Sequence, residues 1–259
     1  MGWRERDAEA VATITACRET LAAAGRTVIG EATGRADGDI ADWRHYPADE
    51  VYDAASHAQY FYHRHPAAAS AGGEHGHFHL FLRGEGMPPG ITPLVLPELA
   101  VANAPLPRQS APLKRGGRDE VCHLIAIAID RNGEPVRLFT TNRWVTGETW
   151  YRADDVIRML DYFRVEGDRP SASLNRWLGA LVRLFQPEIA VLLRQRDKTI
   201  AEARWRSRHK DVFENAALEI TSRIDIDLDA RLDAITQRAA PRGPAARRAP
   251  LRQSDGWGV

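Results

Sequence analysis

The chain has 259 residues, of which 44% are hydrophobic, and its 35 basic and 35 acidic side chains cancel to a formal net charge of zero. This apolar and aromatic content excludes wholesale disorder and suits one large domain or two small ones. Two cysteines, Cys17 and Cys122, are too few for a disulfide scaffold or a thiolate zinc site. No apolar run reaches the roughly 18 to 20 residues of a membrane span, so we expect a soluble, cytoplasmic protein with no membrane partner.

The N-terminal part of the chain predicts one helix followed by irregular segments. Residues 4–24 are rich in alanine and glutamate with apolar positions near one stripe, and Gly25 follows, which is typical of an amphipathic helix and its stop. Residues 30–42, rich in glycine and aspartate, predict a loop. In the aromatic and acidic residues 43–53, Pro47 excludes a helix.

Two predicted hairpins follow. Residues 57–65 (HAQYFYHRH) and 74–83 (EHGHFHLFLR) predict two strands joined by a flexible loop. Residues 121–129 and 135–144 flank Asn132-Gly133, a strong hairpin signal, and pairing across that turn sets His123 opposite Asn142. The proline- and glycine-rich residues 84–117 between the hairpins predict a functional cover or an excursion.

The C-terminal part predicts a helical layer and a tail. Helical spacing indicates helices over 153–164 and 171–185, with Ser171 or Ser173 as N-cap, and a charged helix from Pro187 to about 209. Residues 217–228 alternate and predict an extended segment before a last short helix. The tail 238–259 holds five arginines and one aspartate, so we expect it to be disordered, and the rest, residues 1–237, to form a single domain near minus four in charge.

The histidines are the feature that indicates chemistry. Seven of the nine lie between His45 and His79, and His123 opens a later strand. Because strand side chains alternate, a regular strand places His75, His77 and His79 on one face and apolar residues on the other. By the same rule His57, Gln59, Phe61, His63 and His65 share a face of the preceding strand, and His123 shares one with Ile125, Ile127 and Ile129.

An antiparallel register that sets His65 opposite His75 also sets His63 opposite His77. Opposed residues have Cβ atoms about 4.5–5.5 Å apart, which lets two imidazoles converge on one ion. The sequence therefore predicts a divalent transition metal, zinc or iron first, held by three or four of six histidines. These are His63, His65, His75, His77, His79 and His123.

Other polar residues are candidates for supporting parts. Asn142 and Arg143, in TTNRWVTGETW, are candidates for substrate binding, and a turn held by side-chain hydrogen bonds is the alternative. Glu74, Asp49, Glu50 and Asp53 are candidates for a metal ligand or general base, and ordinary loop or cap acids are the alternative. The motifs HExxH, GxSxG and GxGxxG and the P-loop are absent.

Five blocks carry a resemblance. HYPADEVYD, QYFYHRH, GHFHLFLR, HLIAIAID and LFTTNRWVTGETW together resemble an uncharacterised family of bacterial proteins of unknown function, over roughly residues 43–226. The resemblance implies a soluble bacterial protein and supplies no activity and no catalytic residues.

The predicted fold is α+β: an antiparallel sheet of about four to six strands, an N-terminal helix and a C-terminal helical layer. The leading functional hypothesis is a metal-dependent enzyme acting on a small-molecule substrate, with its ion on the sheet face. The alternatives are a non-catalytic metal- or haem-binding protein and a structural histidine network in a protein-interaction module. The basic tail of a neutral chain predicts only salt-sensitive attraction to nucleic acid, so we expect no nucleic-acid partner.

Overall fold

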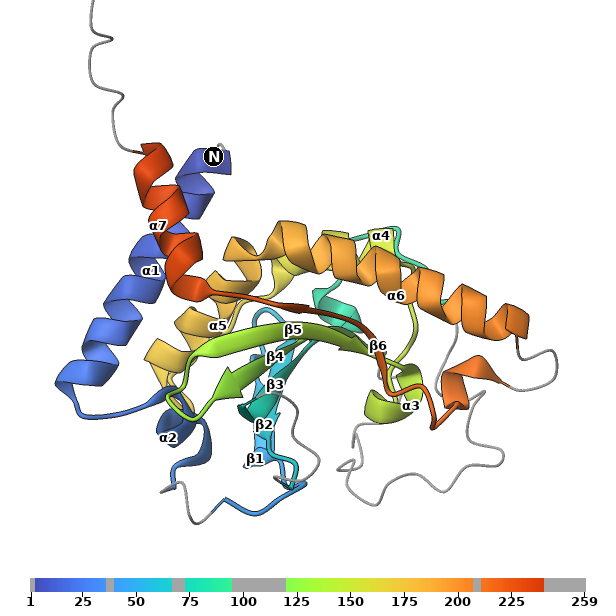
Figure 1. The fold of residues 1–259 in the computed structure, drawn as a ribbon, viewed down its shortest axis with the longest axis horizontal. Coiled ribbons are helices and arrows are strands. Elements are labelled where there is room, and N and C mark those ends of the chain that lie inside the picture. The colour runs from blue at the N-terminus through green and yellow to red at the C-terminus, as the bar shows by residue number, and fades with distance from the viewer. Residues whose placement is uncertain (1–2, 36–39, 67–72, 95–119, 207–210, 240–259) are drawn as a thin grey trace, which may run out of the picture.

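The structure is a computed structural model that describes residues 3–35, 40–66, 73–94, 120–206 and 211–239. In these residues five strands follow the N-terminal helices, and most of the remaining helices precede a sixth strand, which is the predicted α+β arrangement (Figure 1). The strands are β1 (Tyr46–Tyr52), β2 (Ala58–His63), β3 (Glu74–Arg83), β4 (Val121–Asp130), β5 (Pro135–Thr141) and β6 (Ile220–Asp225). The α-helices are α1 (Trp3–Ala23), α2 (Val28–Thr33), α3 (Arg143–Thr146), α4 (Ala153–Met159), α5 (Ala172–Leu184), α6 (Gln186–Arg206) and α7 (Leu228–Ala239). Short 3-10 turns are η2 (Gly84–Gly86), η4 (Leu160–Tyr162) and η5 (Val212–Glu214).

The six strands form one antiparallel sheet whose spatial order is the chain order, β1 to β6. The predicted register of the β4–β5 hairpin is confirmed by the pairs Ala126 with Phe139 and Ile127 with Leu138. Chain reversal uses Gly133, which has a φ of 87° that favours glycine. Each strand therefore pairs with its neighbours in the sequence, and the sheet has β1 and β6 as its edges.

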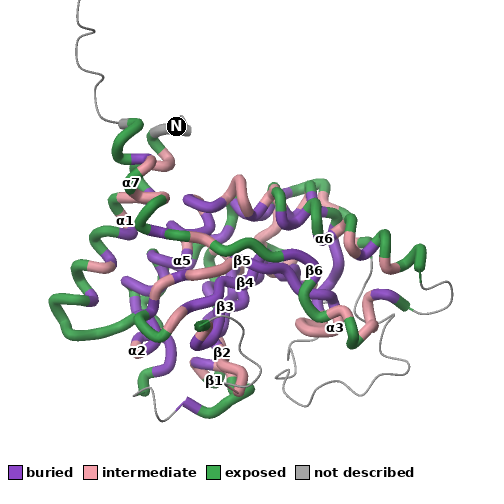
Figure 2. Tube along the Cα trace, in the orientation of Figure 1, coloured by how far each residue is buried: buried purple, intermediate pink, exposed green. Residues whose placement is uncertain are grey.

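Helices cover one face of the sheet. Helices α4, α5 and α6 lie along that face, and α1 and α7 lie beside each other at one end (Figure 1). Side chains such as Leu80, Ile127 and Trp177 belong to one large buried cluster between sheet and helices. Figure 2 shows this pattern, with burial along the sheet and exposure on the outer side of α6.

Several predicted helix ends are confirmed. Gly25, after α1, has a φ of 63° in the left-handed region. At the start of α5, the Ser171 hydroxyl accepts a hydrogen bond from the amide of Leu174 at 3.4 Å, which partners an otherwise orphaned helix N–H.

Three elements were not expected from the sequence. Strand β1 lies in the segment where Pro47 excluded a helix, and an edge strand tolerates proline because one side of its backbone needs no partner. The short helix α2 occupies part of the predicted loop, with Thr27 as its N-cap. Helix α3 replaces the last residues of the predicted strand 135–144.

Two predictions lie largely outside the described residues: the proline-rich segment beyond Leu94 and the C-terminal tail beyond α7. Among the described helices, none combines the length and the apolar character needed to cross a membrane.

Candidate metal centre

The face of the sheet opposite the helices carries the histidines. Strands β2 and β3 pair in the predicted register, with His63 opposite His77 and Phe61 opposite His79. Because side chains alternate, Tyr62 and Phe78 of the same strands point into the helix-side core. One hairpin thus supplies aromatic residues to the core and imidazoles to the other face.

His63, His65 and His77 form the group with metal-binding geometry. One ligand nitrogen from each ring lies within 4.8 Å of the other two. His77 is buried, whereas His63 and His65 are partly exposed, so the group lies between the sheet interior and its surface. Three converging imidazoles are a donor set that suits zinc and iron.

His63 and His77 touch directly, since their Nε2 atoms are 2.6 Å apart. This is a hydrogen-bond distance, so one nitrogen donates a proton to the other. Two nitrogens bound to one tetrahedral ion at about 2.1 Å lie roughly 3.4 Å apart. An ion therefore fits after the two rings separate by less than about 1 Å and the proton between them moves from Nε2 to Nδ1 of His63.

Glu74 orients His77. Its Oε1 lies 2.6 Å from His77 Nδ1, and Arg137 Nη1 lies 3.7 Å from its Oε2. With the carboxylate ionised, His77 donates from Nδ1, and its Nε2 lone pair points to His63. A carboxylate behind a histidine fixes the tautomer and ring direction of a metal ligand. Burial raises the pKa of Glu74, and the neighbouring Arg137 counteracts that rise.

His79 and His123 continue the group deeper along the sheet. His79 Nδ1 lies 3.0 Å from His123 Nε2, and His123 Nδ1 lies 3.3 Å from the hydroxyl of Thr141. The rings of His77 and His79 are 4.9 Å apart, centroid to centroid. We call His63, His65, His77, His79 and His123 the histidine column.

Burial makes the histidine column neutral at pH 7. It lowers the pKa of His77 and of His123 to about 3; repulsion from protonated His65 adds to the fall for His77, and repulsion from Arg196 adds to it for His123. The pKa values of His63 and His79 fall well below the usual range, first through burial and then through neighbouring imidazoles. Neutral imidazole is the form that binds metal, so these rings need no proton loss to become ligands.

The structure places His75 apart from the column. The pairing of β3 with β4 shifts between Glu74 and Gly76, so the alternation breaks there. His75 Nδ1 instead lies 2.6 Å from the hydroxyl of Tyr62, a residue of the helix-side core. The expectation that His75 shares a face with His77 is therefore wrong, and Glu74 reaches His77 in its place.

A second bulge determines the position of His123. The pairing shifts between Leu80 and Phe81, so that Leu80 faces Ile125 while Phe81 faces His123. The side chains of Leu124 and Ile125 both enter the helix-side core. The expectation that His123 shares a face with Ile125 is wrong, and the extra residue is what turns His123 toward His79.

Asn142 and Arg143 form hydrogen bonds and an ion pair with other parts of the fold. The Asn142 side chain caps α3 and donates to the carbonyl of Val212 at 2.9 Å, while Thr141 takes the place beside His123 that was expected for Asn142. Arg143 is buried and forms an ion pair with Glu214. A substrate-binding role for Asn142 and Arg143 stays a prediction, and the alternative, a turn held by side-chain hydrogen bonds, matches these contacts.

The remaining candidate acids have partners outside the proposed ligand set. Asp53 accepts hydrogen bonds from the amides of Ala55 and Ser56 at 3.0 and 2.8 Å, which is a turn cap. Asp49 lies 3.3 Å from Arg169 at the exposed surface. Glu50 lies 2.8 Å from His45 Nδ1.

Two further residues, His45 and Glu148, lie beside the column. His45 stacks on Phe61 with ring centroids 3.7 Å apart and lies 5.7 Å from the ring of His63. Its place in the histidine-rich stretch is the one signal that pointed to it. Glu148 is buried and accepts a hydrogen bond from the amide of His123 at 2.6 Å. Burial raises its pKa to about 7, against the effect of Arg196.

Comparison with protein families gives a match over most of the chain. The family described as "Domain of unknown function (DUF6969)" matches residues 8–226. Neither the curated proteins nor the solved structures give a match.

Proposed function

We propose a function from the histidine column itself, because the chain belongs to the DUF6969 family, whose description assigns no activity. The proposal is that this protein is a metal-dependent enzyme that binds one divalent transition metal, zinc or iron, through His63, His65 and His77. The observation that carries it is the convergence of the three ligand nitrogens within 4.8 Å.

Three neutral ligands leave the charge of the ion uncompensated and at least one coordination position open. An ion in such a site acts as a Lewis acid and lowers the pKa of bound water. The protein's own contribution is orientation: Glu74 holds His77, and the strand register holds His63 beside it. The partial exposure of His63 and His65 gives a small-molecule substrate a route to the open position.

A metal measurement tests this proposal directly. Protein purified without chelators, then equilibrated with zinc or iron(II) and desalted, is expected to hold one ion per chain by elemental analysis. His77→Ala should lose the ion while keeping the circular dichroism spectrum of the folded protein. His75→Ala is the matched control, because His75 lies two residues away on the same strand but contacts Tyr62 instead.

The outcomes separate the alternatives. No bound metal in the unaltered protein would overturn the proposal and favour the structural network, which the direct contacts His63–His77 and His79–His123 support. Equal metal loss in His75→Ala and His77→Ala would overturn the ligand assignment. In cobalt-substituted protein, a visible spectrum that shifts on adding azide indicates an open position, whereas an unchanged spectrum favours a non-catalytic metal-binding protein.

A further inference from the structure

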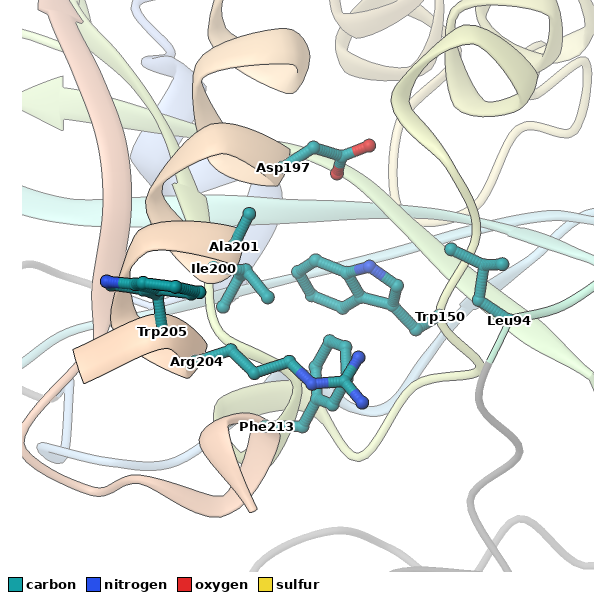
Figure 3. A pocket seen from close by; sticks show the side chains of 8 residues that line it. All are labelled: Leu94, Trp150, Asp197, Ile200, Ala201, Arg204, Trp205 and Phe213. Carbon is teal, nitrogen blue, oxygen red and sulfur yellow. The ribbon is translucent and has the colours of Figure 1, made fainter. Parts of the chain in front are cut away.

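A second candidate site lies at the C-terminal end of α6, away from the proposed metal ligands. A pocket of about 600 Å³ opens there, a volume typical of small-molecule sites. Figure 3 shows Trp150 and Phe213 side by side on one side of the pocket and residues of α6 on the other. The lining residues are Leu94, Trp150, Asp197, Ile200, Ala201, Arg204, Trp205 and Phe213.

Trp150 is a fixed, buried support for the wall of this pocket. Its ring is buried, and the guanidinium of Arg196 lies 4.2 Å from the ring centroid. The ring of Phe213 lies 5.0 Å away at 59°. Arg196 is itself held, since it donates to the carbonyl of Tyr151 at 2.6 Å. Because Trp150 is held from several sides, it fixes the partly exposed Phe213 that packs on it, and Phe213 loses little conformational entropy when a ligand contacts it.

Trp205 is an exposed aromatic side chain at the rim of the pocket. It is 81% exposed, although it lines the same pocket as the buried Trp150. A large exposed indole at the rim of an apolar pocket gains favourable burial when a planar group enters.

The charge of the pocket is positive. The carboxylate of Asp197 is already used, because its Oδ1 accepts from Arg196 at 2.7 Å and its Oδ2 accepts from the amide of Ala153 at 2.7 Å. Arg204 is exposed and, within the part of the chain that the structure describes, forms no ion pair. An anionic group in the pocket therefore has one guanidinium available for pairing.

We propose that this pocket binds a small aromatic carboxylate, whose ring lies against Trp205 and Phe213 and whose carboxylate pairs with Arg204. None of the histidines of the column lines the pocket. The proposal thus goes beyond the proposed metal-dependent activity and stands whether or not a metal binds.

Three probes with the same ring test the ligand class: indole-3-acetate, neutral indole and cationic tryptamine, each titrated into the full chain by isothermal calorimetry. We expect indole-3-acetate to bind in a saturable manner at least ten-fold more tightly than tryptamine, with indole between them. Binding of tryptamine equal to that of the acid, or no saturable binding of any probe, would overturn the proposal.

Variants place the ligand in this pocket. Arg204→Gln should weaken indole-3-acetate about ten-fold and leave indole unchanged, whereas the matched control Arg206→Gln should change neither, because Arg206 pairs with Glu202 and does not line the pocket. Ala201→Trp, at an exposed position of α6, should block all three probes by filling the pocket. Undiminished binding in both Arg204→Gln and Ala201→Trp would contradict the assignment.

Discussion

The two faces of the sheet are built by the same strands but are stabilised by different interactions. On the helix-covered face, side chains such as Leu80 and Ile127 are fully buried among other apolar groups. On the opposite face, His79 and His123 are nearly as buried, and their ring nitrogens bond to each other and to Thr141. A polar group tolerates burial when it is partnered. The histidine face therefore gives up apolar packing for a set of neutral ligand atoms.

The largest expected difference between the faces is in acid stability. Burial places the pKa values of His63, His77, His79 and His123 below their unfolded value near 6.5. The unfolded chain then binds more protons, so stability present above pH 6.5 is lost as the pH falls toward 3. Between pH 7 and 5, proton uptake by the unfolded chain at each of these histidines should lower the free energy of unfolding by about 2 kcal/mol.

Glu148 acts in the opposite direction. Its pKa of about 7 lies above the usual carboxyl value. The stability that Glu148 contributes is therefore present at low pH and is lost as the pH rises from 4.5 through 7. Between pH 7 and 5 this contribution offsets the effect of about one histidine. Urea unfolding at pH 7, 6 and 5 measures the sum. His79→Leu should reduce the loss between pH 7 and 5 by about 2 kcal/mol; an unchanged loss would show that the column is not neutral in the folded state.

The next effect concerns the helix-covered face alone. Leu80→Ala removes a fully buried side chain of β3 and is expected to lower the free energy of unfolding by about 2–5 kcal/mol. The metal content of the molecules that remain folded should not change, because Leu80 points away from the column. Urea unfolding measures the loss of stability, and elemental analysis measures the metal content. Metal loss in a folded variant would mean that the faces are not independent.

A smaller effect is expected for the carboxylate behind His77. Glu74→Gln keeps the size of the side chain but removes the charge that fixes the His77 tautomer, so zinc affinity should fall about 10- to 100-fold. Competition with a chromophoric zinc chelator measures the change. Glu50→Gln is the control, since Glu50 contacts His45; equal weakening in both variants would assign the effect to general electrostatics.

The smallest expected effect is the pH dependence of metal affinity. Three ordinary histidines with a pKa near 6.5 would lose roughly fifty-fold in affinity between pH 7.5 and 6 through proton competition. His63, His65 and His77 have lowered pKa values, so we expect only a few-fold change. Zinc titrations at the two pH values decide between these results, and a fifty-fold loss would indicate exposed, protonatable ligands.

The hairpins that carry the histidines are predictable from the sequence, but the bulges within them are not. Period-two alternation and the Asn132-Gly133 turn predicted the hairpins, and the register placing His63 opposite His77 is confirmed. The positions of His75 and His123 were wrong, because each lies beside a bulge where one extra residue reverses the alternation. Nothing in the local sequence marks these bulges, since they arise from fitting two neighbouring strands together.

Strand β1 and the partners of Asn142 were missed for a related reason. An edge strand containing Pro47 has no strong strand signal of its own and forms because β2 offers it a partner. Asn142 and Arg143 find Val212 and Glu214, some seventy residues away in the chain. Such contacts depend on the folded arrangement and have no local pattern.

The hairpin of β2 and β3 has a consequence for the order in which the molecule assembles. His63 and His77 are 14 positions apart, whereas His79 and His123 are 44 apart. Closing the shorter loop costs less chain entropy, and isolated hairpins form within about 1–10 μs. The three proposed ligands can therefore meet before the rest of the sheet exists. An ion captured at that stage would hold the hairpin in register while β4 adds to it.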